Sequence, residues 1–128
     1  YAGSSLKPEE AEAYAEKIRI FMQSGKPFLD PNLTLAQLSD ALEIPSHYLS
    51  QVINEVFGLN FFNFVNGYRV EEVKLRILNP KYDSFSVLGI ALECGFNSKT
   101  AFNRIFKNMT GLTPTEYKKA NSHQSIHL

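Results

Sequence analysis

The 128 residues suffice for one domain, or for two small lobes that share a connecting element, and a composition of 44% hydrophobic and 20% charged residues is typical of a soluble globular protein. A single cysteine, Cys94, excludes an internal disulfide and a thiolate zinc cluster, and no apolar run reaches the roughly 20 residues that a membrane-spanning helix needs. The net charge is zero, but residues 1–58 carry 4 − 8 = −4 and residues 59–128 carry 9 − 5 = +4, which predicts a basic face in the second half.

A first helix is expected near the N-terminus, as a packing brace rather than a functional site. Pro8 suits the first turn of a helix and Gly25 suits its end. Apolar residues recur between them at helical spacing, which predicts one buried face: Ala11, Tyr14, Ala15, Ile18, Phe21 and Met22. Pro27 and Pro31 then mark a loop.

A helix-turn-helix is predicted over residues 34–57. Thr34 and Gln37 have the spacing of a capping box, in which each side chain bonds the backbone N–H of the other residue. Pro45 breaks the first helix, and Ser46 is expected to cap the second. The apolar faces of the two helices are Leu35, Leu38, Ala41 and Leu42, and then Leu49, Val52, Ile53, Val56 and Phe57.

A longer helix is expected over residues 60–78, closed by Asn79 and Pro80. Its apolar residues form two partly overlapping faces, which suits an element packed between two lobes.

A second helix-turn-helix is predicted over residues 86–110. Ser86 and Ser98 are the expected N-caps of its two helices. Gly95 allows the positive φ that a tight turn needs, and Phe96 is expected to fill the core between the helices. The residues expected to be buried are Leu88, Ile90, Ala91, Phe102, Ile105, Phe106 and Met109.

The last part of the chain predicts a short helix followed by a tail. Thr113, Pro114 and Glu116 supply an N-cap, a first-turn proline and a capping-box glutamate. Residues 121–128 are interpreted as a frayed tail.

The two helix-turn-helix units are copies of one pattern. A shift of 53 residues superimposes their second helices, whereas the shift before the turn is 52, so the second turn is one residue longer. The polar positions repeat as well: His47, Ser50, Gln51 and Asn54 fall on Thr100, Asn103, Arg104 and Lys107. Both sets are spaced i, i+3, i+4, i+7, so each is expected to line one exposed helix face.

These faces carry side chains that can read DNA. Gln and Asn can form two hydrogen bonds with adenine, Arg can do so with guanine, and Ser, Thr and His can bond either groove edge. Lys99 and Lys107 suit phosphates, as do Ser46 and Ser98 at the N-termini of their helices. A single face of this kind would more often be a solvated surface, but two matched faces, each after a tight turn, favour DNA reading. The first face has no Lys or Arg, so we expect it to contribute less affinity.

A spaced set of residues in the second unit carries a family signature: Ile90, Ala91, Gly95, Phe96, Ser98, Phe102, Arg104, Phe106, Lys107, Gly111, Thr113, Pro114 and Tyr117. The first unit and the connector add Leu38, Tyr48, Leu49, Ser50, Gly58, Phe61, Phe64, Arg69 and Val70. Together these residues closely resemble the AraC/XylS family over about residues 32–120. The chain departs from the family pattern at Ser39, Glu43, Pro45 and Val73, where small, turn or capping residues are usual.

The resemblance implies an all-α fold of seven helices, in which two helix-turn-helix units joined by a long linker helix enter adjacent major grooves on one face of DNA. It implies a bacterial transcription regulator, usually a cytoplasmic activator that also contacts RNA polymerase; some members are membrane-tethered, and most carry a sensor or dimerisation domain ahead of this region. It divides the chain into an extension with a packing helix (1–31), a DNA-binding domain (32–120) and a flexible tail (121–128). The base-reading positions carry over to His47, Ser50, Gln51 and Asn54 in the first recognition helix, and to Lys99, Thr100, Asn103 and Arg104 in the second.

Two other classes of function compete with DNA reading. A helical protein-interaction module would carry the same polar faces as solvated surfaces and would dock a partner through its acidic first half; a positive stripe joining both recognition helices would argue against it. An enzyme is not expected, because His47, His123 and His127 have no metal-ligand spacing with Cys94. No Gly-rich phosphate loop or nucleophile motif is present either, so we expect no cofactor and no metal.

Overall fold

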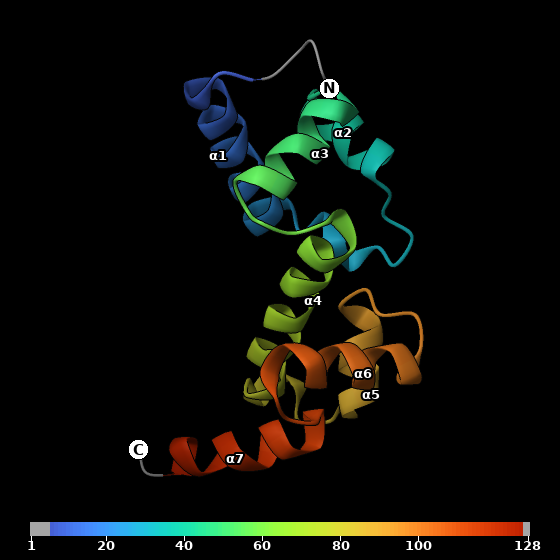
Figure 1. Cartoon of the computed structure of the whole chain (residues 1–128). Coiled ribbons are helices and arrows are strands. Elements are labelled where there is room, and N and C mark those ends of the chain that lie inside the picture. Colours follow the sequence, from blue (N-terminus) through green and yellow to red (C-terminus); the bar gives the residue numbers. More distant parts are fainter. Residues whose placement is uncertain (1–5, 127–128) are drawn as a thin grey trace. The chain divides into compact units, whose positions relative to one another are not determined.

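The computed structural model describes residues 6–126 of the chain, with side chains as far as residue 122. Within this range it consists of seven α-helices and two short 3-10 helices, with no strand (Figure 1). The elements are α1 (Pro8–Gly25), η1 (Pro27–Leu29), α2 (Leu35–Leu42), α3 (Ser46–Glu55), α4 (Phe61–Ile77), η2 (Pro80–Tyr82), α5 (Val87–Glu93), α6 (Lys99–Thr110) and α7 (Pro114–Ile126). The predicted all-α, seven-helix fold is confirmed.

The chain forms two compact units, whose boundary falls inside α4. Unit 1 comprises Tyr1–Phe28 and Asn32–Val65, and unit 2 comprises Leu29–Pro31 and Asn66–Leu128. Each helix-turn-helix therefore lies in a unit of its own, and α4 contributes residues to both.

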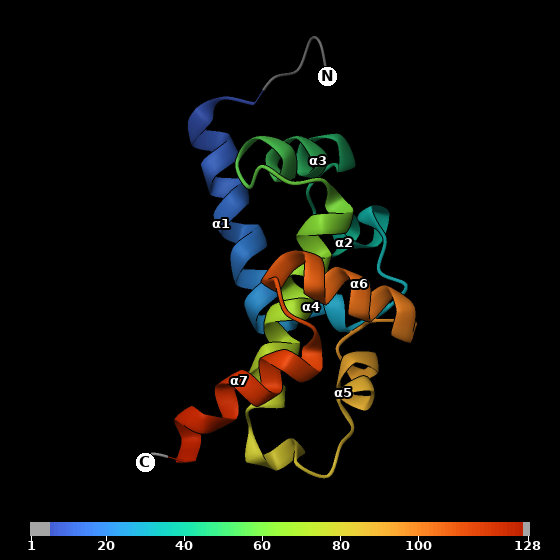
Figure 2. The same ribbon diagram turned by 60° about the horizontal axis from the view of Figure 1, so that its bottom comes forward.

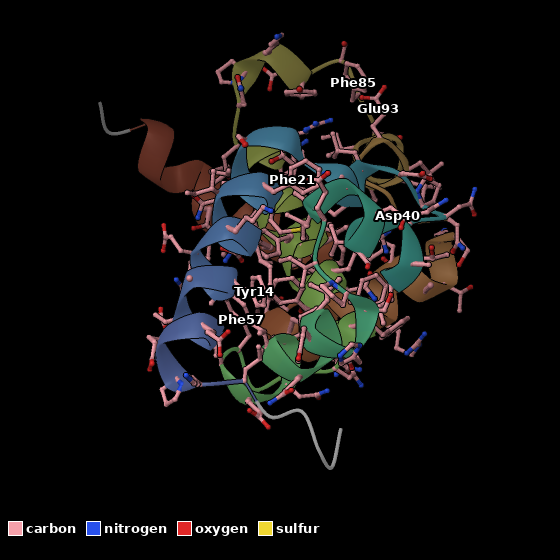
Figure 3. The ribbon with its side chains drawn as sticks, turned by 90° about the horizontal axis from the view of Figure 1, so that it is seen from above. Tyr14, Phe21, Asp40, Phe57, Phe85 and Glu93 are labelled. Atoms are coloured by element: carbon pink, nitrogen blue, oxygen red, sulfur yellow. The ribbon has the colours of Figure 1, made fainter. Side chains whose placement is uncertain are left out.

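In unit 1 the core forms where α1 packs on α2 and α3. The buried residues are Ala15, Ile18, Met22, Phe28, Leu38, Leu42, Ile44, Leu49, Val52, Ile53, Phe64 and Val65. Figures 1 and 2 show α1 running beside α3, and in Figure 3 Tyr14 and Phe21 lie on the inner side of α1, toward the other two helices. The ring of Tyr14 lies 6.2 Å from that of Tyr48 on α3, and the guanidinium of Arg19 lies 5.2 Å from the ring centre of Phe57. The brace predicted for α1 is thus part of unit 1.

The core of unit 2 joins α4, α5 and α6. Its buried residues are Val70, Val73, Ile77, Ile90, Ala91, Cys94, Phe96, Phe102, Ile105 and Phe106. Phe96, which follows the turn, stacks at 5.1 Å on Phe102, and Tyr117 of α7 packs edge-on against Phe106 at 5.6 Å. The thiol of Cys94 is fully buried among these side chains, which is a packing role.

A buried arginine ties the segment after η1 to α4 within unit 2. The Arg69 guanidinium donates to the carbonyl of Asp30 at 2.8 Å and to Oδ1 of Asn66 at 3.0 Å. Burial lowers the pKa of Arg69, and the charge of Asp30 partly offsets that effect. Residues 29–31 belong to unit 2, although they lie far from α4 in the sequence, and Leu29 packs against the core of that unit.

Most of the predicted helix ends are confirmed by hydrogen bonds. The N–H of Thr34 donates to Oε1 of Gln37 at 3.0 Å, and Oγ1 of Thr34 accepts from the N–H of Gln37 at 3.1 Å. The same reciprocal pair joins Thr113 and Glu116 at the start of α7, at 2.8 and 3.1 Å. Both predicted capping boxes therefore form.

Several local predictions are wrong. Ser46 does not cap α3, because Pro45 occupies the N-cap position and Ser46 is the first helical residue. Met109 was expected to be buried but is 41% exposed. It lies in the last turn of α6, beyond Phe106, the last buried residue of that helix. The expected tail is helical through residue 126, because no Gly or Pro interrupts the chain after Tyr117.

Candidate nucleic-acid interface

The sequence repeat is also a structural repeat. The second helices, α3 and α6, begin at Ser46 and Lys99, which differ by 53 positions; the first helices, α2 and α5, begin at Leu35 and Val87, which differ by 52. The glycines that follow the second helices, Gly58 and Gly111, both have positive φ, 70° and 81°.

The turns inside the two units share one backbone geometry. Glu43 has φ 55° and Gly95, its counterpart, has φ 104°. The next residue is buried in both cases, and its N–H donates to a carbonyl five residues earlier: Ile44 to Ser39 at 3.2 Å, and Phe96 to Ala91 at 3.1 Å. The second helix of each unit therefore begins after the same kind of turn.

The family departures at Ser39 and Glu43 meet at the first turn. Glu43 adopts the left-handed conformation that glycine tolerates best, and so carries backbone strain that Gly95 does not. The hydroxyl of Ser39 donates to the carbonyl of Ile44, a bond that the equivalent alanine, Ala91, cannot make. The extra hydrogen bond therefore fixes the turn in which the strained residue stands.

The second recognition helix, α6, presents the expected polar face. Its side chains Lys99, Thr100, Asn103, Arg104 and Lys107 are all exposed, opposite the buried stripe of Phe102, Ile105 and Phe106. The hydroxyl of Ser98 accepts from the N–H of Ala101 at 3.1 Å, which confirms it as the N-cap. No acidic residue lies on α6, so these five side chains form a polar and basic face.

The first recognition helix, α3, presents a narrower face. His47 and Asn54 are exposed and Ser50 is half-buried. The His47 ring lies 4.2 Å from that of Tyr48, and Nδ2 of Asn54 donates to the carbonyl of Ser50 at 3.0 Å. Asn54 thus keeps Oδ1 as an acceptor and the second N–H of Nδ2 as a donor.

Gln51 departs from the predicted pattern. Only 7% of it is exposed, so the expectation that it shares an exposed face with His47 and Asn54 is wrong. Its Nε2 donates to Oε2 of Glu55 at 3.3 Å, and its Oε1 is buried without a hydrogen-bond partner. The sequence of α3 gives no signal for this burial, because it depends on how the helices of unit 1 pack around the residue.

The two units carry net charges of opposite sign, as the sequence predicts. Unit 1 carries 4 Lys/Arg and 7 Asp/Glu, hence 4 − 7 = −3, and unit 2 carries 9 and 6, hence 9 − 6 = +3. The first recognition helix has no basic residue, whereas α6 has three, Lys99, Arg104 and Lys107.

The described part of the chain holds neither a metal-binding cluster nor a membrane-spanning helix. No three His, Cys, Asp or Glu side chains there lie together so that they could hold a metal ion. No helix between residues 6 and 126 has the length and apolar character to cross a membrane. The side chains of His123 and His127 lie outside the described residues.

Comparisons with known proteins agree with this geometry. A family model described as a helix-turn-helix domain matches residues 38–120. An uncharacterised HTH-type transcriptional regulator of Staphylococcus aureus (strain COL) is 34% identical over 87 residues, which are 68% of this chain and 11% of that protein. The chain thus spans about a tenth of the length of that relative.

Solved structures share the fold. The C-terminal domain of AraT, a response regulator from Geobacillus stearothermophilus, superimposes with a TM-score of 0.65 at 25% identity, over 91% of this chain and 88% of that one. A transcriptional regulator with an AraC-type DNA-binding domain from Chromobacterium violaceum has a TM-score of 0.74 at 17% identity, over 91% and 97% of the two chains. The matched helix-turn-helix units and these comparisons show that the chain belongs to the AraC/XylS family of helix-turn-helix transcription regulators.

Proposed function

We propose that this chain binds double-stranded DNA in a sequence-specific manner, through residues 32–120, with α3 and α6 entering adjacent major grooves. The observation that carries the proposal is the exposed basic and polar face of α6, which directly follows a tight turn and contains no acidic residue. A major groove about 12 Å wide admits one α-helix, and base edges there are read by polar side chains of this kind.

The second unit supplies the strongest base contact. Arg104 is exposed, and a guanidinium can donate two hydrogen bonds to O6 and N7 of guanine. Asn103 and Thr100 lie on the same face and suit adenine or either groove edge. Lys99 and Lys107 flank these residues and suit phosphates, as does the N-terminus of α6 that Ser98 caps.

The first unit contacts base edges through uncharged side chains of α3. His47 and Ser50 can donate or accept, and Oδ1 of Asn54 can accept from the amino group of cytosine or adenine. Ser46, at the first position of α3, lies where a phosphate would meet the helix N-terminus. Without a cation on α3, this unit adds little to the salt-dependent part of the affinity, so unit 2 dominates it.

Selection of bound sequences from a random DNA pool tests the proposal and finds the site together. We expect an asymmetric site of about two helical turns, with an affinity that falls steeply as salt rises. Absence of any enriched sequence, together with no footprint on DNA at low salt, would overturn the proposal.

A charge-matched pair of variants tests the role of Arg104. Arg104→Ala should cost about 1–3 kcal/mol on the selected site and relax the preference at one base position. Lys81→Ala removes the same charge from an exposed residue outside the recognition helices, and should change neither the base preference nor the position at which the protein sits on the DNA site. A uniform loss on all sequences with Arg104→Ala would assign this residue to a phosphate.

The same assay ranks the two units. Asn54→Ala should cost less affinity than Arg104→Ala, because α3 carries no positive charge for the backbone. Equal losses would overturn the ranking.

We propose further, on family resemblance, that the full-length protein activates transcription and contacts RNA polymerase. Transcription in vitro with purified bacterial polymerase, on a promoter carrying the selected site, measures this directly. A fall in transcript when the protein is added would identify a repressor instead.

A further inference from the structure

Gln51 and Arg104 occupy equivalent positions in the two recognition helices but stand in different surroundings. Arg104 is exposed, whereas Gln51 is buried to all but 7%. The repeat would assign both to base reading, so the difference must arise from what packs around each helix.

Around α3, Gln51 lies between the side that carries Tyr48 and the face that carries His47 and Asn54. Tyr48 precedes Gln51 by three residues and Glu55 follows it by four, so the three share one side of the helix. The Tyr48 ring lies 6.2 Å from Tyr14 of α1, and Figure 3 shows Tyr14 on the side of α1 that faces α3. Around the helix Gln51 lies about 40° from His47 and about 60° from Asn54, so it borders the face that carries His47, Ser50 and Asn54, and its burial is what separates it from them.

The polar atoms of Gln51 are committed to this flank. Its Nε2 donates to Oε2 of Glu55, an exposed carboxylate one turn later on α3. Its Oε1 is buried with no donor, an arrangement that costs stability. A base reader would need both amide atoms free at the helix surface.

We propose that Gln51 is a packed residue of unit 1 rather than a base reader, and that the first recognition helix reads DNA through His47, Ser50 and Asn54 alone. The part of this inference that concerns base reading rests on the proposed DNA binding, whereas the part that concerns the packing of Gln51 does not. The specificity of the first unit is then set by a narrower stripe than that of the second, although the sequences of the two helices are aligned position by position.

The test applies one substitution to both equivalent positions. Gln51→Met keeps the volume and removes the unpaired buried oxygen, so the melting temperature should rise by roughly 2–8 °C. The base preference selected from a random pool should stay unchanged. Arg104→Met, the matched control at an exposed position, should leave the melting temperature within about 2 °C and flatten the preference at one base.

Each outcome decides one part of the inference. Loss of preference at one base in Gln51→Met, with its melting temperature unchanged or lower, would overturn the assignment. If the unaltered chain selects no DNA sequence, the proposed function fails, but the melting temperatures still show whether Gln51 is a packed residue. A lower melting temperature in both Gln51→Met and the apolar variant Gln51→Leu would mean that the amide group stabilises unit 1 by hydrogen bonding, and would overturn the packed role assigned to Gln51.

Discussion

Replacing Glu43 with glycine should stabilise unit 1. Glu43 has φ 55° and ψ 39°, and an L-residue in this left-handed region costs about 1–2 kcal/mol. Glycine has no such penalty but loses about 0.5–1 kcal/mol more through chain entropy on folding, so the net gain is about 0.5–1 kcal/mol. The side chain is exposed and its backbone N–H already bonds Asp40 and Ser39, so no other contact is lost. Thermal unfolding followed by circular dichroism should show a rise of about 2–8 °C.

Two further variants distinguish the effect of the backbone conformation on stability from the effect of the side-chain charge. Glu43→Gln removes the charge and keeps the strained φ, so it should change the melting temperature by less than about 2 °C. Gly95→Ala places a Cβ at φ 104° in the second turn and should cost more than about 1 kcal/mol. The reasoning fails if Glu43→Gln stabilises as much as Glu43→Gly, because the gain would then come from charge.

Three other expectations concern capping, burial and pH. Ser98→Ala should cost about 1 kcal/mol in urea unfolding, since the hydroxyl caps α6, whereas Ser46→Ala should cost less than about 0.5 kcal/mol because Ser46 caps nothing; similar costs would contradict the assigned caps. Arg69→Ala leaves the Asp30 carbonyl without its donor and should cost about 1–3 kcal/mol; a loss under about 0.5 kcal/mol would show that the bond is not formed. The bonds from Thr113, with help from Lys107, hold the pKa of Glu116 below its usual value. Its stabilising contribution is therefore complete above about pH 4.3 and disappears as the pH falls through the lower folded-state value, and Glu116→Gln should abolish this part of the acid dependence of the melting temperature.

The sequence alone determined the features that depend on neighbours along the chain. A capping box joins residues three apart, so Thr34 and Gln37 could be recognised from their spacing. The turn geometry at Gly95 and the buried stripes of α3 and α6 likewise follow from local periodicity and from the need for positive φ. The internal repeat and the family signature are themselves sequence properties, and both predicted the two helix-turn-helix units.

Only the tertiary structure decided which flank of each helix is covered. A polar residue at the edge of an amphipathic face is exposed or buried according to the element that packs beside it, and that element is distant in sequence. Gln51 is buried on the flank where Tyr48 meets α1, while Arg104, at the same position of the repeat, is exposed. The contact between Arg69 and Asp30, 39 residues apart, was invisible for the same reason. Packing between helices decides how many positions around α3 are buried, and the periodicity of a single helix contains no information about it.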